Sequence, residues 1–98
     1  PVTAEFTDHV YHQYTMKLHG VDRDALQKHL SDKGIANAVY YPVPLHMQKA
    51  YQDARYQEGD FPITEKLASE VMSLPIHTEF TEEQLKYVTD AVLEFMAQ

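Results

Sequence analysis

Apolar and polar positions first alternate clearly along the chain over residues 9–18, HVYHQYTMKL. Successive side chains of a strand point to opposite faces of a sheet, and the more apolar face here carries Val10, His12, Tyr14, Met16 and Leu18. The β-branched and aromatic residues favour a strand, which Gly20 ends. We therefore expect a half-buried strand in which His12 is a core histidine.

A helix is expected after Gly20, because both of its ends carry recognisable signals. Asp22 suits the N-cap position, where a carboxylate accepts from free backbone N–H groups. Leu26 and Leu30 form a buried stripe one turn apart. Gly34 stands where a C-terminal glycine belongs, and Ile35 can then fold back on Leu30. These signals predict a helix that packs its leucines into the core.

The next segment, IANAVYY at residues 35–41, returns to strand character. A strand, a helix and a second strand predict a crossover unit, with parallel strands if the two are adjacent. A short helix is expected over residues 45–52, and Pro62 favours the start of another. Apolar residues then recur at a helical interval at Ile63, Leu67, Val71 and Leu74. Within the same stretch, SLPI at residues 73–76 has the character of a short strand.

The last predicted helix has the strongest start signal in the chain. Thr81 and Gln84 are spaced as a capping box, and Phe80 and Leu85 as a hydrophobic staple. Its apolar stripe is Leu85, Val88, Val92 and Phe95. Together these elements predict an α/β fold of the two-layer α+β kind, with about three strands in a small sheet and helices packed on it.

Composition agrees with one globular domain over residues 1–98, in which residues 1–8 form a lead-in segment. The chain has no cysteine, which excludes disulfides and thiolate metal sites and agrees with a reducing, cytoplasmic compartment. It shows no signal peptide and no apolar run long enough for a membrane span. The net charge is −7, and residues 51–98 hold ten Asp/Glu against three Lys/Arg. Such a surface makes nucleic acid a poor partner.

The usual catalytic and metal-binding patterns are missing. His9 and His12 have an H-x-x-H spacing, but on a strand that spacing points them to opposite faces, so no metal site is expected. The serines have no nucleophile elbow around them, and the three glycines cannot build a phosphate-binding loop. The chain taken alone therefore has no self-sufficient catalytic constellation.

The stretch YYPVPLHMQKAY, residues 40–51, is the remaining candidate. Pro42 and Pro44 remove two backbone donors and hold the preceding residues extended, which makes the segment stiff. Tyr40, Tyr41 and His46 offer apolar bodies with polar tips, as a ligand surface does. A structural interpretation stays open, in which Tyr40 packs inward, Tyr41 covers an edge and His46 caps the short helix.

Three motifs in this order, YP-x-PLH-x-Q, MSLP and TEEQ, resemble the carboxy-terminal domain of the DegT/DnrJ/StrS family. These are pyridoxal-phosphate-dependent sugar aminotransferases of fold type I. The resemblance implies the small domain of a larger enzyme, whose large domain carries the Schiff-base lysine and most cofactor contacts. It further implies a nucleotide-sugar substrate, an amino donor that is typically glutamate, and a homodimer with the active site at its interface.

The resemblance also implies site residues. Tyr41, Pro42 and His46 match the family motif on the substrate side, whereas Tyr40 stands where the family often has histidine. We expect substrate binding by Tyr41 and His46 and keep Tyr40 as a candidate, although strand alternation would point it to the domain interior. A surface that meets a large domain should be apolar, and its expected members are Val2, Phe6, Val43, Leu45 and Met47. Two alternatives remain, a stand-alone sugar- or protein-binding module and a family dehydratase that lacks the lysine.

Overall fold

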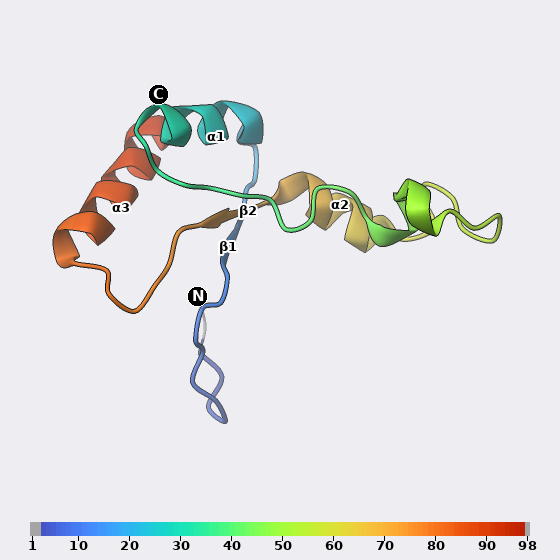
Figure 1. Ribbon diagram of the computed structural model, residues 1–98, viewed down its shortest axis with the longest axis horizontal. Helices are drawn as coiled ribbons and strands as arrows, with labels where there is room; N and C mark the ends of the chain where they lie inside the picture. The colour runs from blue at the N-terminus through green and yellow to red at the C-terminus, as the bar shows by residue number, and fades with distance from the viewer. Residues whose placement is uncertain (1–2, 98) are drawn as a thin grey trace.

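The computed structural model describes residues 3–97 as a mixed α/β domain (Figure 1). Its elements in chain order are β1 (Tyr14–Lys17), α1 (Arg23–Asp32), the 3-10 turns η1 (Leu45–Met47) and η2 (Lys49–Tyr51), α2 (Pro62–Glu70), β2 (Val71–Leu74) and α3 (Glu82–Met96). The α/β class is therefore confirmed. Within residues 3–97, none of the helices combines the length and apolarity needed to cross a bilayer.

The sheet has two strands, and its topology differs from the expected parallel crossover. β1 pairs with β2 in antiparallel register, with Met16 opposite Met72. Residues 35–41 do not form the expected strand and contribute only one antiparallel bridge, between Ala38 and Ser73. Among the residues that the structure describes, no further bridge follows Ala38, and Pro42, four residues later, has no N–H to donate to a neighbouring strand. The predicted third strand is thus reduced to a single bridge.

The hydrophobic core lies where α1 and α3 pack against the sheet (Figure 1). Leu26, Leu30 and Met72 are completely buried, which confirms the leucine stripe predicted for the first helix. Ile35 and Ala91 complete the buried cluster. Around it pack Met16, Leu18, Val21, Leu74, Val88, Val92 and Phe95.

The predicted helix ends are confirmed in detail. The Asp22 carboxylate accepts from the Ala25 N–H at 3.0 Å. At the other end Gly34 adopts φ +73°, and the Ile35 N–H donates to the Leu30 carbonyl at 2.9 Å, as in a Schellman motif. The capping box of α3 is complete, because each of its two side chains accepts from the other residue's backbone N–H.

Three local predictions were wrong. β1 begins at Tyr14, so His12 precedes the ladder and is exposed rather than buried in the core. The helix from Pro62 ends at Glu70, and Val71 joins β2 because it pairs with Lys17 of β1. Residues 45–52 form two 3-10 turns in place of one short helix.

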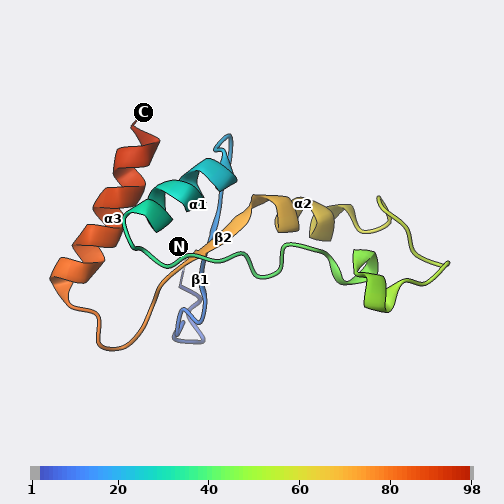
Figure 2. The same ribbon diagram turned by 45° about the horizontal axis from the view of Figure 1, so that its top comes forward.

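The molecule is elongated, with extents of 50 × 37 × 24 Å. Its radius of gyration is 16.1 Å, above the ~13 Å typical of a compact domain of about 100 residues. Figures 1 and 2 show why: residues 42–70 run out from the sheet and return along α2, away from α1 and α3. We call residues 42–70 the arm. The arm carries His46, and Tyr40 and Tyr41 directly precede it.

Candidate functional site

The segment around Pro42 and Pro44 is held by hydrogen bonds from Met47 and Gln48, which follow it in the same motif. The Met47 N–H donates to the Pro44 carbonyl at 2.9 Å, which forms the first 3-10 turn. The Gln48 side-chain amide donates to the Val43 carbonyl at 3.2 Å. With two φ angles fixed by the prolines, these bonds hold the segment in one shape without a ladder or an α-helix.

Tyr40 and Tyr41 both leave the core. Tyr41 is 74% exposed and Tyr40 is 47% exposed. Their rings meet edge to face, with centroids 6.0 Å apart. The expectation that Tyr40 points to the interior is not met in this chain, because strand alternation does not apply where no strand forms. The two tyrosines instead make a continuous aromatic ridge.

An open, largely apolar groove of about 600 Å³ runs beside this ridge, between the proline segment and α2. Its walls include Tyr40, Tyr41, Val43, Tyr51, Leu67 and Val71. Four of the residues expected on an apolar surface are indeed exposed, namely Phe6, Val43, Leu45 and Met47. The fifth, Val2, lies outside the described residues. This groove and its rim give the arm an apolar face.

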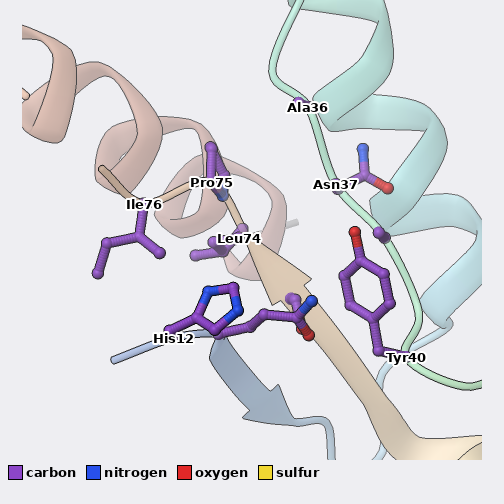
Figure 3. Close-up of a pocket in the computed structure, with 10 residues that line it drawn as sticks. His12, Ala36, Asn37, Tyr40, Leu74, Pro75 and Ile76 are labelled. Atoms are coloured by element: carbon purple, nitrogen blue, oxygen red, sulfur yellow. The ribbon is translucent and has the colours of Figure 1, made fainter. Parts of the chain in front are cut away.

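A second hollow, of about 310 Å³, lies on the other side of Tyr40, near the end of β2. Figure 3 shows the Tyr40 ring on one side of it and His12 on the other. The Asn37 amide in its wall already bonds to Gln27, Ser31 and the Ile35 carbonyl. The Asn37 amide is thus already engaged, and the hollow contains neither Tyr41 nor His46.

His46 faces α2 rather than the groove that Tyr40 and Tyr41 line. Its Nε2 lies 3.0 Å from Oε1 of Glu65, and the two side chains are only 8% and 20% exposed. The imidazole also packs against the Phe61 ring, with centroids 4.8 Å apart. Sequence reasoning missed Glu65, which stands 19 positions beyond His46. Its only signal was a carboxylate in the first turn of a predicted helix.

Glu65 is held by more than the histidine. Its carboxylate accepts from the Gly59 N–H at 2.9 and 3.0 Å and from the Phe61 N–H at 3.2 Å. Burial raises the pKa of this carboxyl. The hydrogen bonds from the two backbone N–H groups and from the imidazole lower the pKa by more than burial raises it, so it lies below its usual value of 4.5. At neutral pH an ionised carboxylate therefore ties the proline segment to the loop before α2.

The described residues do not fit a pyridoxal-phosphate site. That cofactor needs a lysine amine for its aldehyde and backbone donors for its phosphate. Five of the six lysines stand in ion pairs with carboxylates, and the sixth is exposed; the pairs are Lys17–Glu70, Lys28–Asp32, Lys33–Glu94, Lys66–Glu70 and Lys86–Asp90. No group of three His, Asp or Glu within residues 3–97 is placed to hold a metal ion.

Three sequence relatives illustrate what the chain is similar to. A pleiotropic regulatory protein of Geobacillus stearothermophilus is 47% identical over 87 residues, 89% of this chain and 23% of the relative. A dTDP-3-amino-3,4,6-trideoxy-α-D-glucose transaminase of Streptomyces venezuelae is 41% identical over 95 residues, 97% of this chain and 24% of the relative. A UDP-N-acetyl-3-dehydro-α-D-glucosamine 3-aminotransferase of Acidithiobacillus ferrooxidans is 40% identical over 84 residues, 86% of this chain and 22% of the relative. The chain thus spans less than a quarter of the length of each.

Solved structures of aminotransferases also resemble this chain. The crystal structure of S. venezuelae DesV in complex with a ketimine intermediate matches all of this chain and 26% of its own, with a TM-score of 0.87 and 40% identity. An aminotransferase of Brucella abortus matches 86% of this chain and 22% of its own, with a TM-score of 0.74 and 30% identity. The model of the DegT/DnrJ/EryC1/StrS aminotransferase family matches residues 1–93. The chain therefore belongs to the DegT/DnrJ/EryC1/StrS aminotransferase family.

Proposed function

We propose that this chain is the carboxy-terminal small domain of a sugar aminotransferase that moves an amino group, typically from glutamate, to a keto sugar linked to a nucleotide. The observation that carries the proposal is the family match over residues 1–93. Support for the substrate class comes from relatives whose names specify dTDP- and UDP-linked sugars. The family generally uses pyridoxal phosphate, and the proposal assigns that cofactor to the remainder of the full-length protein.

Tyr41 is the residue we propose to meet the substrate, with Tyr40 and His46 as the further candidates, of which His46 faces α2 in this chain. Tyr41 is the most exposed of the three and stands at the start of the stiff segment. A phenol presents a ring face to a sugar or base and a hydroxyl that both donates and accepts. A preformed loop loses little conformational entropy when it closes over a ligand. These properties suit a residue that helps close an active site formed mainly by the large domain.

The proposal also includes the large domain as the partner of the apolar face of the arm, and a cytoplasmic homodimer as the complete enzyme. Exposed apolar side chains gathered along the arm, such as Val43 and Leu45, suit contact with another domain. The position of the apolar groove beside Tyr41 would bring the large domain and the substrate to the same side of this chain.

The test uses the full-length protein loaded with cofactor, supplied with glutamate and UDP-N-acetyl-3-dehydro-α-D-glucosamine, or with 2-oxoglutarate and dTDP-3-amino-3,6-dideoxy-α-D-galactopyranose for the reverse reaction. Turnover of either sugar supports the aminotransferase. In that enzyme Tyr41→Phe should lower kcat/KM about tenfold or more, which corresponds to ~1.4 kcal/mol. Stability should change by less than about 1.5 kcal/mol, because one hydroxyl is lost and little volume.

Two results would contradict the proposed enzyme class, and a third would contradict the proposed role of Tyr41. Loss of water from the sugar without amino transfer would indicate the family dehydratase. Sugar binding by this chain alone, with an affinity equal to that of the full-length protein, would indicate a stand-alone module. Tyr41→Phe without any effect on an active transaminase would leave the enzyme class intact and remove the role of Tyr41.

A further inference from the structure

We propose that Glu65 is a positioning residue that sets the place of Tyr41 by anchoring His46. This inference rests on the proposed function only for its catalytic consequence. The anchoring itself is a property of the arm. His46 and Glu65 lie away from the groove, and the anchoring explains how they can still influence Tyr41 on the substrate side.

The first argument is the number of elements that meet at one carboxylate. Glu65 stands in the first turn of α2, and its side chain accepts from the loop at Gly59, from the backbone of Phe61 and from the His46 imidazole. Phe61, the N-cap residue, makes no side-chain cap bond, and Glu65 reaches back to the Phe61 backbone N–H, as the glutamate of a capping box does. One charged group thus fixes the helix start, the preceding loop and the proline segment together.

The second argument is that the contact is shielded and specifically shaped. The His46 and Glu65 side chains are mostly buried, and the Phe61 ring covers the imidazole. Phe61 is in turn packed against Tyr56, with centroids 5.6 Å apart. Hydrogen bonds to a charged group are stronger when water is excluded, and truncating one partner then leaves the other unpaired. Loss of the Glu65 charge should therefore release His46 rather than leave it in place.

The third argument is the short, stiff connection from His46 back to Tyr41. The four residues between them include Pro42 and Pro44, and Gln48 closes the turn onto Val43. A chain with two fixed φ angles transmits a displacement over so few residues instead of absorbing it. Tyr41 itself is mostly exposed and is joined by a ring contact to Tyr40. Its position therefore depends on the anchor at His46.

The direct test observes Tyr41 in the full-length protein, with 3-fluorotyrosine placed at position 41 and read by ¹⁹F NMR. Glu65→Gln keeps the size of the side chain and removes its charge, and the expected result is a shifted or broadened Tyr41 signal. His46→Asn cuts the same contact from the other side and leaves Glu65 bound to Gly59 and Phe61, so it keeps the test open if Glu65→Gln does not fold. Glu94→Gln, which removes an ion-paired glutamate on α3, is the matched control and should leave the signal in place. An unchanged Tyr41 signal in folded Glu65→Gln or His46→Asn overturns the proposal.

A kinetic experiment separates an effect on the position of Tyr41 from a general loss of stability. Glu65→Gln should raise KM for the sugar nucleotide about tenfold with a smaller change in kcat, as Tyr41→Phe does if its hydroxyl binds the sugar. The double variant Glu65→Gln/Tyr41→Phe should have a kcat/KM little below that of the less active single variant. Both substitutions would remove the same contact between Tyr41 and the sugar, so their effects should not add. Fully additive effects would refute the catalytic role of the anchor. If the full-length protein turns over neither sugar, the proposed function fails, while the ¹⁹F result still decides whether Glu65 places Tyr41.

Discussion

Leu30 shows how much one residue contributes when it has no exposed surface at all. It lies on the face of α1 that packs toward α3 and the sheet. Leu30→Ala should lower the free energy of unfolding by about 2–5 kcal/mol, since it removes buried methyl groups and leaves a cavity. Urea denaturation of the chain measures this loss. Ile63→Ala, on the exposed side of α2, is the control and should cost less than about 1 kcal/mol.

The ion pair between Lys33 and Glu94 makes stability depend on acid pH. The hydrogen bond from the Lys33 ammonium, and then its charge, hold the pKa of the Glu94 carboxyl below its usual value of 4.5. The unfolded chain has the higher pKa, so the contribution of Glu94 is fully present above pH 4.5 and is lost as the pH falls through the lower folded value. Glu94→Gln should therefore flatten the decline of unfolding free energy below pH 4.5, measured by urea titrations at a series of pH values. A decline as steep as in the original chain, or one matched by the exposed-loop control Glu58→Gln, would contradict this assignment.

At the scale of elements, Gly34 decides how α1 ends. Its φ of +73° is a conformation that residues with a Cβ adopt at a cost of roughly 1–2 kcal/mol. No atom lies within 4 Å of a Cβ built at this position, so strain in the backbone is the only penalty. Gly34→Ala should destabilise the chain by about 1 kcal/mol, whereas Gly34→Asn should cost less, because asparagine tolerates this region better. Equal losses for the two variants in thermal unfolding would argue against backbone strain as the cause.

Local signals in the sequence were sufficient for the helix ends and insufficient for the pairing of strands. Asp22, Gly34 and Thr81 act within a few residues of where they stand, so their roles follow from spacing alone. The partner of β1 lies more than 50 positions away, and alternation does not reveal whether it runs parallel or antiparallel. The same limit explains why Glu65 was missed: the proline motif predicted His46 as a site residue, but nothing near it specified what the imidazole would face.

At the scale of the whole molecule, the arm and the core differ in what holds them. The core has a buried apolar cluster, whereas Ala68 is the one buried apolar residue within residues 42–70, and the arm depends on polar contacts around Glu65. An arm with few buried side chains opens more readily than the core. This difference agrees with the proposal that the apolar face of the arm is covered by another domain of the full-length protein.

The whole molecule should also be unable to transaminate without the rest of the enzyme. Five of its lysines are paired with carboxylates and the sixth, Lys49, is exposed, so none is set apart to hold an aldehyde cofactor. Treatment of the isolated chain with pyridoxal phosphate and borohydride should therefore give scattered, substoichiometric labelling of several lysines when the products are mapped by mass spectrometry. The full-length protein, treated in the same way, should give one stoichiometric adduct at a lysine outside these 98 residues. A single stoichiometric adduct on the isolated chain, together with turnover of glutamate, would place the cofactor here and reverse the proposed division of roles.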